Sequence, residues 1–177
     1  MKRIVIYIGA LLMLIVSISC GSEASLQKYY IDSQEDKNFI SLDVPASVLK
    51  LKEGVAQEDK EALESLKKFN ILAFKVDDTN KAQYDTEKQK VKAILKNPKF
   101  KELMRAKDKG INFIIKYEGD DELIDEVIVY ASDKTKGFAL VRVLGDKMDP
   151  AKIMKLANNI REVDSDGFKQ LEGLFNK

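Results

Sequence analysis

The chain has 177 residues, with 30 Lys and Arg against 29 Asp and Glu, one cysteine, and no histidine or tryptophan. This length suits one domain with a real core, and 45% hydrophobic with 33% charged residues is the composition of a folded protein. The missing histidine excludes Ser-His-Asp and Cys-His catalysis and imidazole metal sites. A formal net charge of +1 lacks the basic excess of nucleic-acid-binding proteins, so we expect no nucleic acid among the partners.

The N-terminus has the pattern of a secretory signal. Lys2 and Arg3 precede a mostly apolar run, 4–18, which is shorter than the about 20 residues that a membrane-spanning helix needs. The run ends in Ser17-Ile18-Ser19-Cys20, which resembles a lipobox, the motif at which bacterial lipoprotein processing acylates a cysteine and cleaves just before it. Ser17 departs from that pattern, which favours a larger aliphatic residue. We expect Cys20 to be lipidated; an uncleaved anchor and a chance cysteine in an ordinary signal are the alternatives.

Cleavage before Cys20 divides the chain into a lipoprotein signal peptide (1–19), a lipidated tether (20–38) and a single α+β domain (39–177). The mature chain carries 28 basic and 29 acidic residues, because Lys2 and Arg3 leave with the signal. This balance predicts no electrostatic attraction to anionic lipid, so the acyl chains alone hold the protein. Gly21 carries no aspartate-type signal for inner-membrane retention. We therefore expect a lipid-anchored protein of the cell envelope, at the outer membrane.

Hydrophobic periodicity predicts the elements of the domain. The polar segment 20–38 contains a short helix around 26–31, whose tyrosines we expect to pack on the domain. Pro45 begins another short helix, which carries Val48, Leu49 and Leu51 inward. Strands are predicted at 40–44, 71–74, 111–117, 123–131 and 138–144. Longer helical segments are predicted at 57–69, 86–96, 150–160 and 166–175, and another short helix at 98–109.

Short connections make the last three strands antiparallel neighbours, so we expect a meander. Across its second hairpin Arg142 should pair with Glu126 or Asp125. Asp149 is a predicted N-cap with Pro150 at the first helical position. The predicted fold class is α+β: a single, mostly antiparallel sheet of about five strands with a C-terminal three-strand meander and helices packed on one face.

Three groups of carboxylates are candidate sites. The acidic cluster 118–122 has oxygen ligands for Ca²⁺ or Mg²⁺, but a solvated hairpin turn is favoured. Asp146 and Asp149 are candidates for an acid/base pair, although turn formation and capping explain both. The segment 164–167 lacks the acidic first and twelfth positions of a calcium loop. We assign no catalytic, cofactor-binding or metal-ligating residue and expect no cofactor.

Three stretches resemble a family of bacterial lipoproteins catalogued as domain of unknown function 4252. They are FISLDVPASVLKL (39–51), FKELMRAKDKG (100–110) and IDEVIVYASD with GFALVRVLGDKMDPAKIMKLA (within 124–157). The last is the most specific, with a strand entering Leu144-Gly145-Asp146 before a capped helix. The resemblance implies an envelope lipoprotein without assigned activity and supplies no catalytic residues.

The leading functional hypothesis is a noncatalytic, lipid-anchored module that binds a protein or another envelope component. Its partners are then the membrane, through acylated Cys20, and an envelope protein. The alternative is a carboxylate-based periplasmic hydrolase, with or without a metal ion, using carboxylates such as Asp146 and Asp149. A third hypothesis is a structural or regulatory accessory, which deletion would reveal through changed envelope-stress transcription.

Overall fold

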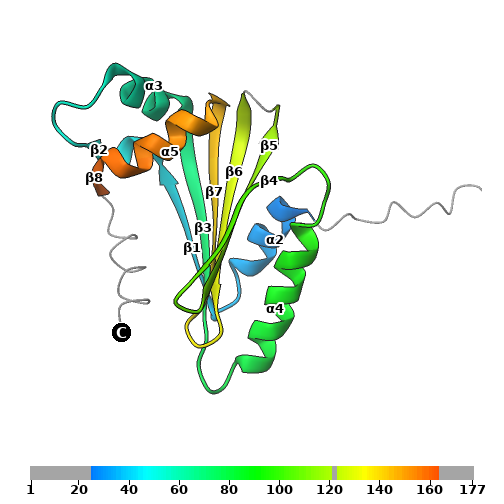
Figure 1. Cartoon of the computed structure of the whole chain (residues 1–177). Coiled ribbons are helices and arrows are strands. Elements are labelled where there is room, and N and C mark those ends of the chain that lie inside the picture. Colours follow the sequence, from blue (N-terminus) through cyan, green and yellow to red (C-terminus); the bar gives the residue numbers. More distant parts are fainter. Residues whose placement is uncertain (1–24, 121–122, 164–177) are drawn as a thin grey trace, which may run out of the picture.

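The computed structural model describes residues 25–120 and 123–163 (Figure 1). The predicted signal peptide, Cys20, the segment 164–167 and the last predicted helix (166–175) lie outside the described residues. Within them, no helix is both long enough and apolar enough to cross a bilayer.

A six-stranded antiparallel sheet forms the centre of the fold, in the order β1-β3-β7-β6-β5-β4. Strands β4 to β7 follow each other in the chain as a meander, and β3 pairs with the free side of β7. The strands are β1 (Phe39–Pro45), β3 (Leu66–Lys75), β4 (Lys101–Asp108), β5 (Ile111–Gly119), β6 (Ile124–Asp133) and β7 (Gly137–Met148).

Four α-helices and a second, two-stranded sheet complete the described fold. The helices are α2 (Leu26–Ser33), α3 (Gln57–Ser65), α4 (Lys81–Ile94) and α5 (Pro150–Asn159). The small sheet pairs β2 (Leu49–Leu51) with β8 (Ile160–Val163), and a 3₁₀ turn, η2 (Ala46–Val48), leads into β2.

The two faces of the large sheet are covered differently. Helices α2 and α4 pack on one face over a buried cluster that includes Leu72, Phe74, Tyr130 and Phe138. The opposite face belongs to separate clusters, in which α3 and α5 pack against β3, β6 and β7. Figure 1 shows α3 and α5 together at one end of the sheet, away from α4. This second face is therefore covered by helices only near that end, among the described residues.

The α+β class and the C-terminal meander are confirmed. The predicted cap is also present: Asp149 Oδ1 accepts from the backbone N–H groups of Ala151 and Lys152 at 2.8 and 3.2 Å. Six strands replace the expected five or so, and helices lie against both faces. The extra strand in the large sheet is β4.

The predicted helix at 98–109 is wrong, since Lys101–Asp108 forms β4. Its residues are helix formers, but the chain after them reverses through Lys109 and Gly110, whose φ angles are +45° and +91°. Two successive positive φ angles are typical of a tight hairpin turn, so β4 pairs with β5. Gly110 therefore belongs to a hairpin and does not end a helix.

Two other predicted helices are shorter in the structure. The segment 57–69 is helical only to Ser65, because Leu66 enters β3 and pairs across a bulge with β7. The short helix expected after Pro45 is one 3₁₀ turn, and Leu49–Leu51 is a strand. In both cases pairing with a distant strand overrides local helix propensity.

The segment assigned to the tether contributes a packed helix, α2. Its N-cap Ser25 accepts from the Lys28 N–H at 3.5 Å, and Leu26, Tyr29 and Tyr30 are buried at 3 to 7% exposure. Ile31, the neighbouring residue, is 55% exposed. Among the described residues, the packed fold therefore includes 26–33, which precede residue 39.

Candidate functional site

Asp146 and Asp149 have separate partners. Asp149 caps α5, whereas the Asp146 carboxylate is 64% exposed and lies 3.8 Å from the Lys67 ammonium group. Both contacts are those expected of turn and cap residues. The structure thus accounts for each carboxylate without joining them in one site.

The acidic cluster at 118–122 lies at the connection between β5 and β6, as predicted. Glu118 Oε2 accepts from Lys99 Nζ at 2.9 Å, and the Asp120 N–H donates to the Leu123 carbonyl. Residues 121 and 122 lie outside the described residues. Within the described part of the chain, no three acidic side chains gather as metal ligands would.

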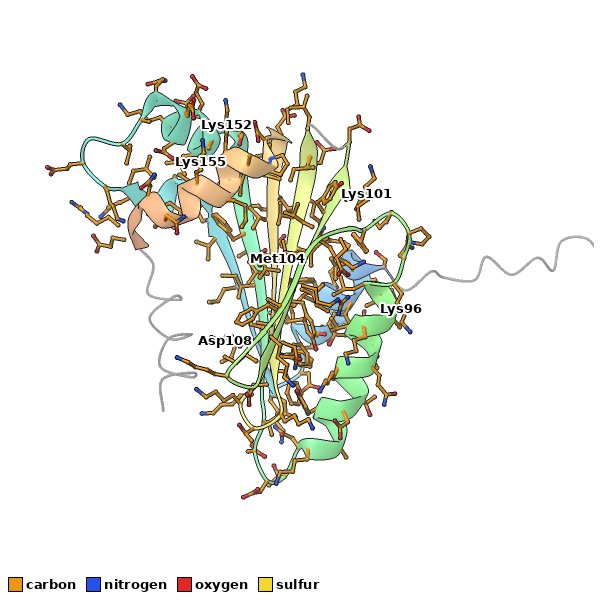
Figure 2. The ribbon with its side chains drawn as sticks, viewed as in Figure 1. Lys96, Lys101, Met104, Asp108, Lys152 and Lys155 are labelled. Atoms are coloured by element: carbon orange, nitrogen blue, oxygen red, sulfur yellow. The ribbon has the colours of Figure 1, made fainter. Side chains whose placement is uncertain are left out.

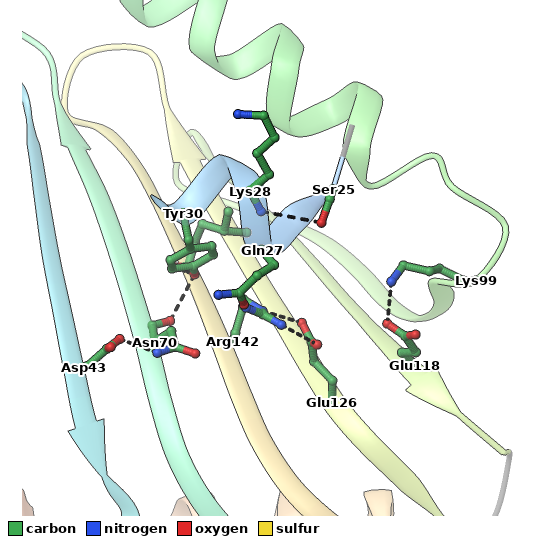
Figure 3. A network of polar contacts seen from close by, with 11 residues as sticks. Ser25, Gln27, Lys28, Tyr30, Asp43, Asn70, Lys99, Glu118, Glu126 and Arg142 are labelled. Atoms are coloured by element: carbon green, nitrogen blue, oxygen red, sulfur yellow. Dashed lines mark hydrogen bonds and ion pairs between the residues drawn. The ribbon is translucent and has the colours of Figure 1, made fainter. Parts of the chain in front are cut away.

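A polar network lies between α2 and the sheet, centred on Arg142 of β7 (Figure 3). Its guanidinium donates to both carboxylate oxygens of Glu126, at 2.7 and 2.8 Å, and to Gln27 Oε1 at 2.5 Å. This confirms the predicted cross-strand ion pair, and both partners are buried, at 8 and 7% exposure. Burial lowers the pKa of Arg142, but the hydrogen bonds and charge of Glu126 outweigh it, so the pKa lies above its usual value.

Tyr30 connects this network to the backbone of two strands. Its hydroxyl lies 2.5 Å from the Leu140 carbonyl and 3.0 Å from the Asn70 carbonyl, and its ring centroid is 5.5 Å from Arg142 Cζ. Asn70 also donates to the Asp43 carboxylate on β1. Every charged member of the centre is paired, so we assign this network to the docking of α2, not to ligand binding.

The opposite face of the sheet is apolar across all six strands. The strand registers align two transverse rows of side chains on this face. Every member of both rows is apolar. One row is Leu42, Ile71, Val141, Val129, Ile115 and Met104, and the next is Ile40, Ala73, Ala139, Ala131, Phe113 and Ala106.

An apolar groove of about 330 Å³ opens on this face between α5 and the β4 edge. Its floor consists of strand side chains that include Phe69, Ile115 and Val129, and α5 forms one wall through Ile153 and Met154. Leu103 of β4 lines the other side. Leu103 and Met154 are 41% and 46% exposed, so two large apolar side chains at the rim of the groove are in contact with solvent. Figure 2 shows β4, with Lys101, Met104 and Asp108 along it, crossing in front of the sheet.

The groove was not predicted from the sequence. A helix at 98–109 would direct Leu103 and Met104 toward the core, whereas both side chains are exposed on β4. One available signal was the meander itself: Val127, Val129, Val141 and Val143 are apolar at alternate positions, and Ile128 between the first two is apolar as well. Strands apolar on both sides indicate a sheet covered on both faces, which one helical layer cannot provide.

A known family model matches most of the described fold. Residues 29–156 match the family model described as Domain of unknown function (DUF4252). The match spans β1 to β7 and most of α5, so the chain belongs to the DUF4252 family. No curated protein and no solved structure matches the chain.

Proposed function

We propose that the protein is a lipid-anchored, noncatalytic module of the cell envelope, whose groove binds an amphipathic segment of a protein partner. The observation that carries this proposal is the groove between α5 and β4, with its partly exposed rim residues Leu103 and Met154. Grooves of this kind receive apolar side chains spaced along one face of a helix. The exposed rim favours a protein segment over a lipid enclosed in a cavity.

The groove is suited to binding because its lining is apolar. Burying an apolar side chain there gains about 25 cal/mol per Å² removed from water. Two or three such side chains form the anchor of a typical interface, with polar contacts at the rim. No catalytic role is required of the lining residues.

Site-specific photo-crosslinking in cells tests the binding site. A photoreactive residue replaces Met154 or Leu103 at the rim, or Ile31, an exposed apolar residue of α2 that serves as the matched control. We expect one protein adduct at both rim positions and none at Ile31. The adduct formed from position 103 should disappear when Met154→Glu is also present.

Two results would contradict the proposed binding site. One is the same set of adducts at all three positions. The other is a rim crosslink confined to the chain's own residues 164–177, whose apolar spacing makes them the competing occupant. A chain ending at Val163 distinguishes this result from binding of a partner, because the crosslink to the chain's own residues is then lost.

The lipid anchor rests on the lipobox-like sequence ending at Cys20, the single cysteine of the chain. Cys20→Ala should leave the precursor uncleaved and abolish incorporation of labelled fatty acid. Cys20→Ala that is processed and labelled like the parent chain would refute lipidation. Fractionation of inner and outer membranes then tests the proposed outer-membrane location.

A further inference from the structure

The charge of this protein is unevenly distributed. Residues 88–109 contain nine Lys and Arg but only two Asp and Glu, a local charge of +7 in a chain whose formal net charge is +1. These residues form the second half of α4, the connection after it, and β4. All side chains of β4 are exposed, as are those of Lys92 on α4 and Lys96 just after it. We call this region, together with Lys116, the basic surface.

Part of the basic surface carries charge that nearby carboxylates do not neutralise. Lys99 pairs with Glu118 at 2.9 Å, and Arg105 forms a two-point contact with Glu102 at 3.0 and 2.6 Å. Lys92 and Lys96, by contrast, have no ion pair with another described residue. The region therefore keeps a positive excess even when these pairs and the Lys90–Glu87 pair at 2.7 Å are counted.

A shallow depression concentrates this excess. It has a volume of about 440 Å³ and is lined by Lys92, Lys96, Arg105 and Lys116, with Glu102 as the one carboxylate. Leu95 and Ile114 form its apolar base. Four cations around one concave surface suit a phosphate-bearing group, for which Arg105 can exchange its contact with Glu102.

The basic surface lies beside the point at which the chain leads to the proposed anchor. Leu26, the first residue of α2, belongs to the same buried cluster as Ile94, Leu95 and Phe100. Figure 3 shows Ser25 at the start of α2, at the end of this helix that is nearer to Lys99. Five peptide steps separate Cys20 from Ser25, and at about 3.5 Å each they keep the two Cα atoms within about 18 Å.

We propose that the basic surface rests on anionic phospholipid headgroups beside the acylated Cys20, with a phosphate in the depression. This inference rests on the proposed lipid anchor, because the short link holds the surface at a high local concentration near the bilayer. Each basic residue near an anionic bilayer strengthens binding about fivefold. The groove lies on the other face of the sheet, so this orientation leaves it accessible to a partner.

Vesicle sedimentation tests the inference with unlipidated chain, residues 20–177 carrying Cys20→Ala. The vesicles are pure phosphatidylcholine, or phosphatidylcholine with about one phosphatidylglycerol in three lipids. We expect binding to the anionic vesicles alone, decreasing as salt rises from about 0.05 M to about 0.5 M. Because no lipid is attached, this result does not depend on the outcome of the Cys20 processing test.

Matched variants locate the binding surface. Lys92→Gln with Lys96→Gln should weaken binding to anionic vesicles at least about tenfold. Lys152→Gln with Lys155→Gln removes the same charge from α5, at the other end of the molecule in Figure 2, and should change binding less than about twofold. Urea midpoints show whether both variants are folded. If either variant is not folded, the salt and lipid dependence of binding by the parent chain still tests the inference.

Three results would overturn the inference. The first is equal binding to neutral and anionic vesicles. The second is an equal loss in both lysine pairs, which would show an effect of net charge. The third is tighter binding to a DNA duplex than to the anionic vesicles, which would identify nucleic acid as the ligand of the basic surface.

Discussion

At the residue scale, the Arg142–Glu126 pair is the most consequential polar contact. Both residues are nearly inaccessible, and their two-point contact sits beneath Gln27 and Tyr30 of α2. The pairing was predictable because strand alternation puts both side chains on one face of a hairpin. Its burial was not predictable, since burial depends on α2, a helix from the segment assigned to the tether.

Glu126→Gln should lower the free energy of unfolding by about 3 kcal/mol, because Arg142 would keep a buried charge without its counterion. Glu102→Gln is a matched control, since Glu102 makes the same two-point contact with Arg105 at the surface, where the side chains are 40% and 59% exposed. It should cost much less, because exposed ion pairs contribute little to stability. Urea denaturation followed by circular dichroism measures both, and equal losses would show that burial of the pair contributes nothing.

The cap of α5 permits a second test. Asp149→Ala removes the acceptor for the Ala151 and Lys152 N–H groups and should cost about 1 kcal/mol. Asp149→Asn keeps an acceptor oxygen and should stay close to the parent protein. Thermal unfolding distinguishes them, and equal destabilisation by Asn and Ala would mean that the charge of Asp149, not its capping bond, matters.

At the element scale, local sequence predicted the strands better than the helices. Strands β1, β5, β6 and β7 show alternation or strong β-forming residues, and the structure has strands at the predicted places. Strand β4 is different: Lys101–Asp108 favours a helix in isolation and is extended because β5 offers a partner across a tight turn. The groove was missed for the same reason, as Leu103 lines it only when β4 is a strand.

Helix α2 supplies the prediction at this scale. A chain beginning at Phe39 loses the burial of Leu26, Tyr29 and Tyr30 and leaves Arg142 uncovered. Its free energy of unfolding should fall by more than about 5 kcal/mol relative to a chain beginning at Ser25, comparable to the whole stability of a small domain. Ile31→Ala, at an exposed position of the same helix, is the control and should have little effect. Equal urea midpoints for the two chains would place the domain boundary at residue 39 after all.

At the scale of the whole molecule, the core under α2 and α4 is rich in buried phenols. Burial is the main reason that the pKa values of Tyr29, Tyr30, Tyr84 and Tyr130 are raised, for Tyr84 to about 12. An unfolded chain ionises its tyrosines near pH 10, whereas the folded chain retains these protons to higher pH.

The stability that these four tyrosines contribute is therefore fully present below about pH 10. It is lost as the pH rises through their pKa values in the folded chain. We expect urea midpoints to fall above about pH 10, together with delayed phenolate absorbance. Tyr84→Phe should reduce the alkaline loss without changing its direction. A midpoint that is constant to pH 12 would contradict the assigned pKa shifts.

The distribution of charge also belongs to this scale. The near-neutral net charge predicted no attraction to anionic lipid, but a net charge does not say where the charged residues lie on the surface. Folding places Lys92, Lys96, Arg105 and Lys116 around one depression, whereas most of the compensating acidic residues lie elsewhere in the chain. The proposed membrane contact follows from that separation.

The sequence by itself determined the α+β class, the meander, the cap at Asp149 and a cross-strand ion pair of Arg142 with Glu126 or Asp125. These depend on alternation, turn residues and contacts between chain neighbours, all of which act over a few residues. Only the tertiary structure decided that 26–33 packs as a helix, that 101–108 is an edge strand, and that an apolar groove and a basic depression lie on opposite faces of the sheet. Those features arise where distant segments meet, and there strand pairing and burial outweigh local preference.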